Sequence, residues 1–424
     1  MSERPEVPAQ SPSTDAPAQG AATKHATEPE NRWSVAFREI VGGSWGVSVG
    51  AVLLAIVAGS IMIVATDEGV RSTAGYFFGR PGDMLSAAWN AISDAYAALF
   101  RGALWDYTAD SFGDAVRPLT TTLNFATPLI GAGLGLAVGF RAGLFNIGGQ
   151  GQMILAAIGA GWIGFALDLP WPVHMVVAIV VGVLCGAVWA GIAGLLKALT
   201  GAHEVISTIM LNHTAFYLLF FLLATPGLLQ APGSANPKTP AMKEGAIMPK
   251  IFGSGYAVHL GFVLALLAVV LTWWLLERSR LGMTFRAVGE NPKAARVAGI
   301  DVPRTTVWVM LVSGALVALA GVTQVLGTSV TGFSTDVDAG MGFDAITVAL
   351  LGRSSPLGVL GAAILFGGFR AGGATMQAAE RIPIEIVTVV QSLIVLFIAA
   401  PPLVRAILRL PRPGARTARK EVAA

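Results

Sequence analysis

The sequence is poor in charged residues and in cysteine. Only 12% of its 424 residues are charged and 54% are hydrophobic, whereas soluble domains carry about 25% charged residues. Too few charges are present to cover a water-soluble surface of this size, which disfavours a soluble enzyme, a nucleic-acid-binding protein and a disordered scaffold. The single cysteine, Cys185, excludes a disulfide framework and a cysteine-ligated metal cluster.

Motifs of nucleotide hydrolysis and of zinc chemistry are also lacking. The dipeptide Gly-Lys occurs nowhere, which excludes a phosphate-binding P-loop in this chain, and no His-Glu-x-x-His motif occurs. Formal matches to a nucleophile elbow at 42–46 and to a dinucleotide fingerprint at 159–164 do not lie between a strand and a helix, so we interpret both as chance. The sequence therefore predicts no cofactor and no metal in this chain.

Long charge-free runs are present instead. Seven of them exceed the roughly 20 apolar residues that a helix needs to cross a bilayer core of about 30 Å, and the run 386–404 also fits. The stretch 336–369 can form either two short spans or one span plus a re-entrant segment, and we favour two, which gives about ten spans. Because unpaired backbone groups in lipid are too costly, the predicted fold class is all-α, a polytopic integral membrane protein.

The distribution of basic residues predicts the orientation and the domain boundaries. Most of the 28 Lys and Arg fall on the inside if both termini are cytoplasmic, as the positive-inside rule requires. The same distribution argues against a nucleic-acid partner. Residues 1–32 hold almost no large aliphatic side chain and are predicted to be a disordered cytoplasmic tail. Residues 40–405 form the predicted transmembrane domain, and 406–424 a basic cytoplasmic tail.

Glycine is abundant, with 51 residues, and part of it is regularly spaced. Gly131, Gly135 and Gly139 follow one another at intervals of four, as do Gly182 and Gly186. This spacing places the members of each set on one helix face, where backbones can approach closely. We interpret both sets as helix-packing positions.

Three amide side chains and several glycines fall between two apolar runs, in the segment Gly143–Gln152. The amides are Asn146, Gln150 and Gln152. The glycines disfavour a continuous helix, and broken helix at membrane depth is tolerated where it lines a cavity or is buried in protein. The segment is either a break that lines a solute pathway or an ordinary turn between two spans.

A polar stripe begins a later apolar run. Glu204, Thr208 and Asn212 are four residues apart, so they share one helix face, and that face cannot comfortably contact lipid. Two interpretations remain open. The stripe either forms hydrogen bonds between helices or lines a solute pathway.

The one long cytoplasmic loop, 277–304, encodes a short capped helix. Asn291 is a good N-cap, Pro292 suits the first helical position and Gly299 is a natural terminator. Small side chains give this helix a narrow face, which fits docking into a groove of another protein. They are Ala294, Ala295 and Ala298.

Together, the segments Gly143–Gln152, Glu204–Asn212 and Gly289–Ile300 resemble the permease subunits of ABC-type importers. They resemble more narrowly the branched-chain amino acid/ribose superfamily and its nucleoside and simple-sugar branch. The resemblance covers about residues 40–405. Lys293 stands where the older coupling signature Glu-Ala-Ala-x-x-x-Gly has glutamate, and Gly299 is the glycine of that signature.

The resemblance implies a permease domain at 40–405 whose loop 277–304 couples to a separate ABC-type ATPase, which would carry ATP-Mg. It also implies a second identical or homologous permease, an extracytoplasmic solute-binding protein or lipoprotein, contact with membrane lipid, and a prokaryotic plasma membrane. The expected function is inward transport of a small polar solute. A nucleoside is the best substrate, with a simple sugar as the alternative.

Two rival functions need features that the sequence does not show. An ion-coupled secondary transporter needs intramembrane carboxylates, but the candidates Glu204, Asp344 and Glu385 lie near predicted span ends. A membrane-embedded enzyme needs a cluster of His, Asp, Glu or Cys at one membrane face, and the sequence does not indicate one.

Overall fold

The computed structural model describes residues 44–409 apart from Ala235, and Val47–Arg409 form one compact unit. The predicted tail 1–32 lies outside the described residues, as does the predicted tail 406–424 beyond Arg409. The described part is helical and contains an isolated bridge between Lys250 and His259 but no strand. This confirms the predicted all-α class.

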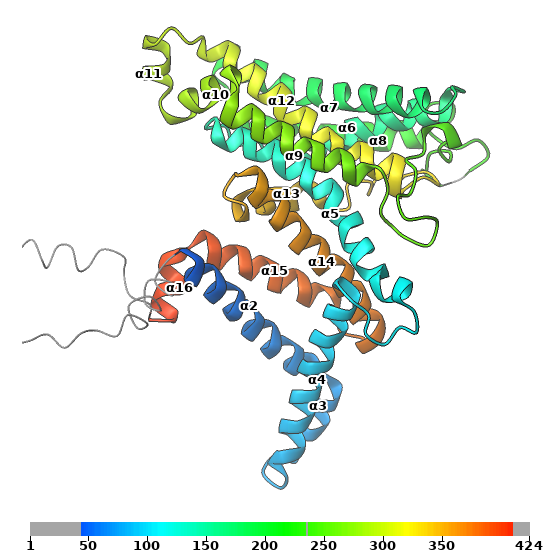
Figure 1. Cartoon of the computed structure of the whole chain (residues 1–424), viewed down its shortest axis with the longest axis vertical. Helices are drawn as coiled ribbons and strands as arrows, with labels where there is room; N and C mark the ends of the chain where they lie inside the picture. The colour runs from blue at the N-terminus through cyan, green and yellow to red at the C-terminus, as the bar shows by residue number, and fades with distance from the viewer. Residues whose placement is uncertain (1–43, 235, 410–424) are drawn as a thin grey trace, which may run out of the picture. The chain divides into compact units, whose positions relative to one another are not determined.

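The helices follow one another in the order shown in Figure 1. They are α2 Ser44–Thr66, α3 Glu68–Ala74, α4 Pro81–Ala103, α5 Phe112–Arg141, α6 Gly149–Ala166, α7 Val173–Thr200, α8 Glu204–Ala224, η1 Glu244–Ala246, α9 Gly261–Arg278, α10 Arg280–Glu290, α11 Pro292–Val297, α12 Val302–Thr323, η2 Gln324–Thr328, α13 Met341–Leu351, α14 Pro356–Glu380, α15 Ile384–Ala399 and α16 Pro401–Ile407.

Within the described residues, six helices are long and apolar enough to cross a membrane, namely α5, α7, α8, α9, α12 with η2, and α14. The bent pair α2 and α3 provides a seventh candidate. Ten spans would require α6, α13 and α15 in addition, so that number and the orientation of the termini stay predictions. α6 is apolar except for its first turn, which contains Gln150 and Gln152.

The ambiguous stretch 336–369 does contain the predicted break, which separates α13 from α14. α13 has 11 residues, a length of about 16 Å at 1.5 Å per residue. That is roughly half of a bilayer core. α13 can therefore cross only together with the irregular segment 329–340 that precedes it.

The helices pack in two groups that share α5. One group contains α6, α7, α8 and α12, and the other contains α4, α13, α14 and α15. α5 contacts both α12 and α14, and Figure 1 shows it passing from one group to the other. α5 therefore lies between the two groups.

Glycines allow the closest of these helix contacts. A methyl group on Gly131 or Gly135 would meet the backbone of α12, and one on Gly186 would meet Ala318 of α12. A methyl group on Gly182 would likewise meet Val322. The predicted helix-packing role is confirmed for these four glycines, whereas a methyl group on Gly139 would meet the Leu144 carbonyl oxygen of the loop that follows α5.

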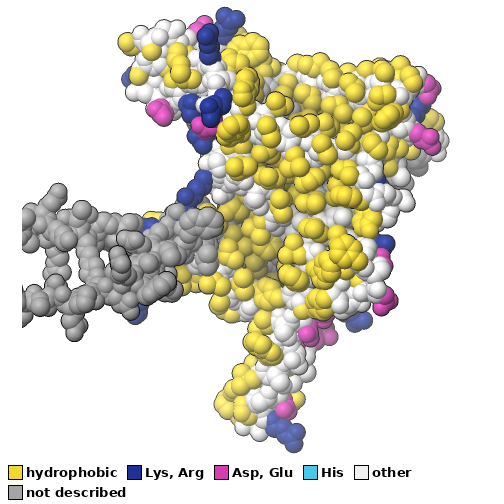
Figure 2. Space-filling model, viewed as in Figure 1, with side chains coloured by type: hydrophobic (Ala, Val, Ile, Leu, Met, Phe, Trp, Pro, Cys, Tyr) yellow, Lys and Arg dark blue, Asp and Glu magenta, His cyan; other side chains and the backbone are white. Residues whose placement is uncertain are grey.

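The outer surface has the distribution expected of a membrane protein. Figure 2 shows hydrophobic side chains over the helices, with charged side chains gathered at the α10–α11 end and along the opposite edge. The exposed apolar side chains of α9 include Leu267, Val270 and Leu271, each more than half exposed. Such a surface avoids water only in contact with lipid or with another chain.

Candidate functional site

An irregular loop separates α5 from α6. α5 ends at Arg141 and α6 begins at Gly149, so the break contains Gly143 and Gly148, whereas Gly149 and Gly151 lie in the first turn of α6. Gly143 has a φ of +69°, a conformation that favours glycine. We call residues 142–148 the broken loop. The predicted Gln150 and Gln152 lie in the first turn of α6.

The polar stripe of α8 holds this loop by its backbone. Asn212 Oδ1 accepts a hydrogen bond from the Gly151 amide at 2.8 Å, and Asn212 Nδ2 donates to the Ile147 carbonyl at 2.9 Å. Thr208 Oγ1 accepts from the Ile147 amide at 3.3 Å. Asn212 and Thr208 are buried. Backbone groups that a regular helix would pair are therefore satisfied by side chains of a neighbouring helix.

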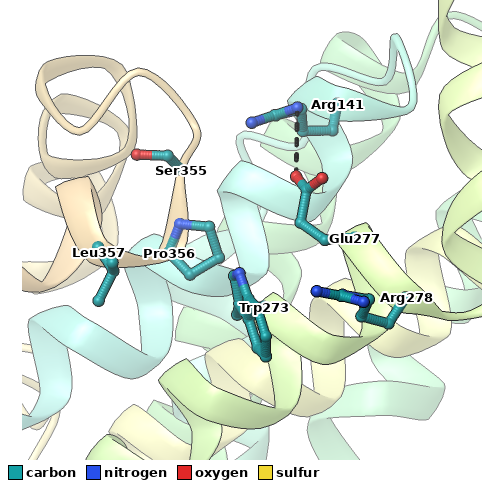
Figure 3. Close-up of a pocket in the computed structure, with 7 residues that line it drawn as sticks. All are labelled: Arg141, Trp273, Glu277, Arg278, Ser355, Pro356 and Leu357. Atoms are coloured by element: carbon teal, nitrogen blue, oxygen red, sulfur yellow. Dashed lines mark ion pairs between the residues drawn. The ribbon is translucent and has the colours of Figure 1, made fainter.

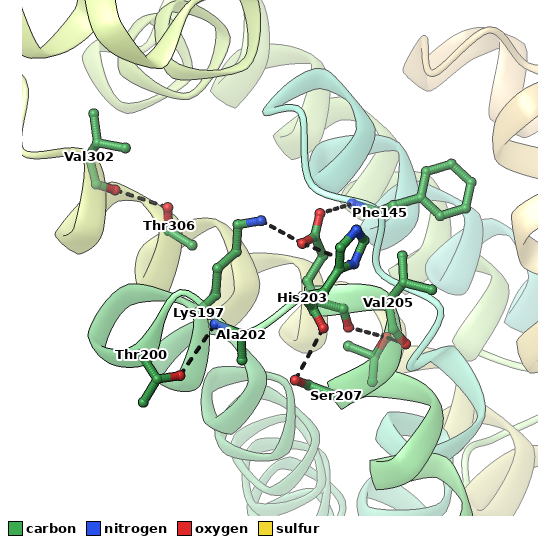
Figure 4. A network of polar contacts seen from close by, with 11 residues as sticks. Phe145, Lys197, Thr200, Ala202, His203, Val205, Ser207, Val302 and Thr306 are labelled. Atoms are coloured by element: carbon green, nitrogen blue, oxygen red, sulfur yellow. Dashed lines mark hydrogen bonds and ion pairs between the residues drawn. The ribbon is translucent and has the colours of Figure 1, made fainter.

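Glu204 extends the contact to the beginning of the loop. Its Oε1 accepts a hydrogen bond from the Phe145 amide at 3.4 Å, and its other oxygen pairs with the Lys197 ammonium of α7. Figure 4 shows Lys197 reaching this carboxylate, with His203 beside it. The ion pair compensates the charge of a carboxylate that is 7% exposed. Lys197 was not among the predicted site residues.

Asn146 ties the centre of the loop to α12. Its side chain is fully buried. Nδ2 donates to Ser313 Oγ at 3.0 Å, and Ser313 in turn donates to the Gly135 carbonyl at 2.7 Å. Asn146 and Gln152 also exchange a pair of amide hydrogen bonds. The broken loop, α12 and α5 are thus linked by hydrogen bonds around the buried amide of Asn146.

Gln150 points instead toward a buried carboxylate. Its Nε2 lies 3.4 Å from Asp338 Oδ1. Asp338 is 4% exposed, and among the described residues its Oδ2 receives no hydrogen bond. Nearby, Arg370 pairs with Asp344 at 2.7 Å and donates to the Ala339 carbonyl. A buried, unpaired carboxylate oxygen is costly unless something donates to it, so Asp338 is a candidate acceptor for a solute hydroxyl or ring N–H group.

The structure brings two of the predicted motifs together. Five of the six predicted pathway residues are buried in one hydrogen-bonded group, and Gln150 is the only partly exposed one. Contact with a solute stays a prediction for all six. Asp338 was not predicted, because the charge of a residue beside a glycine-rich turn gives no sign of its burial.

The predicted short helix is confirmed as α11, Pro292–Val297. Asn291 Oδ1 caps it by accepting from the Lys293 and Ala294 amides at 3.0 and 3.1 Å. Gly299 follows the helix with a φ of +84°, as a left-handed terminator requires. Local signals alone specified this element.

The exposed face of α11 differs from the prediction at one residue. Ala295 is 4% exposed, so its side chain packs inside this chain and cannot present a docking surface. Val297 is 91% exposed and shares a helix face with the exposed Ala294 and Ala298. The exposed face of α11 therefore includes Ala294, Val297 and Ala298, and its docking to another protein stays a prediction.

A backbone contact joins α10 to the broken loop. We call α10 and the short helix α11 that follows it the α10–α11 hairpin. A methyl group on Gly289 of α10 would overlap the Arg141 carbonyl oxygen and the backbone of Ala142. A methyl group on Gly143 would in turn lie 3.1 Å from the Gly289 carbonyl oxygen. Gly289 and Gly143 each belong to a motif noted in the sequence, but no sequence signal indicated that these motifs, about 150 positions apart, are in contact. The two candidate sites are thus in direct contact.

A family match covers both sites. Residues 119–399 match the family described as the branched-chain amino acid transport system / permease component. The chain belongs to this permease family. The resemblance noted in the sequence is thereby confirmed, and the chain is a multi-pass membrane permease subunit.

Several characterised permeases are similar over most of this permease's length. The guanosine ABC transporter permease protein NupP of Bacillus subtilis is 34% identical over 370 residues, which cover 86% of this permease and 96% of the relative. The nucleoside ABC transporter permease protein NupB of Lactococcus lactis is 33% identical, with coverages of 77% and 88%. A glucose ABC transporter permease of Haloferax volcanii is 33% identical, with coverages of 72% and 80%. No solved structure matches this permease.

Proposed function

We propose that this permease is the membrane subunit of an ABC importer that moves a nucleoside into the cell. The similarity to a guanosine permease over 86% of the chain carries this proposal, and the nucleoside permease of Lactococcus lactis supports it. The glucose permease of Haloferax volcanii makes a simple sugar the second candidate. The site contains amide and hydroxyl groups and the Asp338 carboxylate, which can form hydrogen bonds with a neutral solute.

The remaining parts of the proposal follow from the same membership. We place ten spans at α2, α5–α9, α12–α15, with the irregular segment 329–340 completing the crossing of α13, and both termini in the cytoplasm of a prokaryotic cell. ATP-Mg would bind a separate ATPase that contacts α11. A second permease chain and an extracytoplasmic solute-binding protein would complete the transporter.

Within this arrangement, Asp338 and Gln150 are the proposed solute contacts. Both lie where the start of α6 meets the start of α13, as a methyl group on Gly149 would approach the Gly342 carbonyl oxygen to 2.8 Å. Sites at paired helix interruptions are a common design in transporters. A carboxylate and an amide can together accept and donate hydrogen bonds to a ribose or a nucleobase.

Uptake of radiolabelled solutes tests the proposal. Cells that contain the permease with its ATPase and binding protein should accumulate a nucleoside and lose that uptake when ATP is depleted. The purified permease alone should hydrolyse no ATP, because it has no P-loop. Uptake of sugars alone would favour the second candidate. Uptake driven by an ion gradient without ATP would contradict the proposal.

A substitution on α11 tests the ATPase contact. Val297→Glu should leave the permease folded, because the side chain is 91% exposed. It would bury an unpaired carboxylate in the ATPase interface, at a cost on the order of several kcal/mol. Co-purification with the ATPase and ATP-driven uptake should both fall strongly. The nearly isosteric Val297→Thr is the control, and normal co-purification of Val297→Glu would show that α11 is not the contact.

A further inference from the structure

A pocket with a positive rim lies where α9 leads into α10. Its volume is about 440 Å³, and it is lined by the ends of three helices. Arg141 comes from the end of α5, Trp273 and Arg278 from the end of α9, and Leu357 from the start of α14. Figure 3 shows the α14 residues on one side of the pocket and Glu277 and Arg278 on the other.

The pocket has more positive than negative charge. Among the described residues that line the pocket, Glu277 has the only carboxylate. Arg141 at 4.0 Å and Arg286 at 3.4 Å share that carboxylate. The Arg278 guanidinium lies 5.8 Å from the centre of the Trp273 ring. No ion pair among the described residues includes Arg278. The α14 N-terminus adds partial positive charge, so the pocket is suited to an anion.

The surroundings of the pocket are apolar. Leu357 at its edge is 71% exposed, and Trp274, which follows the pocket residue Trp273 on α9, is 55% exposed. Farther along α9 the exposed surface continues with Leu271, Val270 and Leu267. Tryptophan is enriched where a membrane meets water. A ligand that fits both the positively charged pocket and the apolar surface along α9 has an anionic head and apolar chains.

We infer that this pocket binds the headgroup of an anionic phospholipid, whose acyl chains lie along α9. A lipid uses the arginines, the indole ring and the apolar strip at once, whereas free phosphate would use only the arginines. Basic pockets between helices at a membrane surface commonly hold such headgroups. The bound lipid would brace α9, which continues into the α10–α11 hairpin, against α14. This inference depends only on the membrane location of the permease and not on its solute.

Native mass spectrometry of the detergent-solubilised full chain tests the site. Phosphatidylglycerol should bind in preference to phosphatidylcholine. Arg278→Gln should weaken phosphatidylglycerol binding about fivefold, the usual effect of one arginine near an anionic lipid, and Trp273→Leu should also weaken it. Arg278 is exposed, so the variant should fold. Arg280→Gln, which changes an exposed arginine that does not line the pocket, is the matched control and should bind normally.

Three results would overturn the inference. Equal binding of phosphatidylglycerol to all variants would show that the pocket does not hold it. Displacement of phosphatidylglycerol by inorganic phosphate would show a phosphate site in place of a lipid site. Loss of ATPase co-purification in Arg278→Gln with unchanged lipid binding would show that the pocket contacts a protein.

Discussion

Replacing Gly289 with alanine should largely abolish ATP-driven uptake. The new methyl group would overlap the Arg141 carbonyl oxygen and the Ala142 backbone, and such overpacking typically costs about 1–3 kcal/mol. Alanine is otherwise favoured over glycine inside a helix by about 1 kcal/mol, so a loss of stability must come from the contact. Thermal unfolding and uptake would both be measured.

A matched control is available in α14. Gly361 is also helical, and a methyl group there would have no neighbour within 4 Å, so Gly361→Ala should be neutral or slightly stabilising. The Gly289→Ala permease should still co-purify with the ATPase, because α11 is unchanged, and this separates it from Val297→Glu. Normal uptake and normal stability in Gly289→Ala would show that this contact does not link α10 to the broken loop.

Replacing Asn212 with leucine should have the second large effect, mainly on stability. The change removes the acceptor of the Gly151 amide and the donor to the Ile147 carbonyl. A buried polar group left without a partner costs about 1–3 kcal/mol, whereas interhelical hydrogen bonds in membranes average roughly 0.6 kcal/mol. We therefore expect a loss on the order of 1–3 kcal/mol in the free energy of unfolding, measured by thermal or denaturant unfolding in detergent.

Thr214→Leu is the control for this substitution. Thr214 lies on the exposed face of the same helix and bonds only its own turn, so its loss should be nearly neutral. If uptake in Asn212→Leu falls while stability is unchanged, Asn212 contacts the solute and does not hold the loop. That result would contradict the role that the structure supports.

The sequence predicted those features that depend on nearby residues. The cap at Asn291, the proline after it and Gly299 define α11 within nine positions, so the helix could be found without knowing its surroundings. The four-residue spacing of Glu204, Thr208 and Asn212 likewise placed them on one face. In each case the hydrogen bonds or the geometry act within one or two turns of helix.

Features that depend on distant contacts could not be predicted. The broken loop ends before Gly149 because Thr208 and Asn212 of α8 satisfy the backbone groups of Ile147, and no local pattern encodes those partners. Ala295 was expected to face outward, yet which side of a short helix is buried depends on α10 and α12. Asp338 contacts Gln150, and Gly289 contacts Arg141 and Ala142. In both cases the partners lie at least 140 positions away in the sequence.

The way in which the broken loop is held also has a consequence for its motion. Loops of this length usually fluctuate within nanoseconds to microseconds. Here α8 holds the backbone on one side and Ser313 of α12 holds Asn146 on the other. The loop can move only when those helices move with it, and such collective displacements take microseconds to milliseconds. The rate at which the broken loop rearranges is therefore set by the motion of α8 and α12, and it is slow enough to accompany each cycle of a transporter.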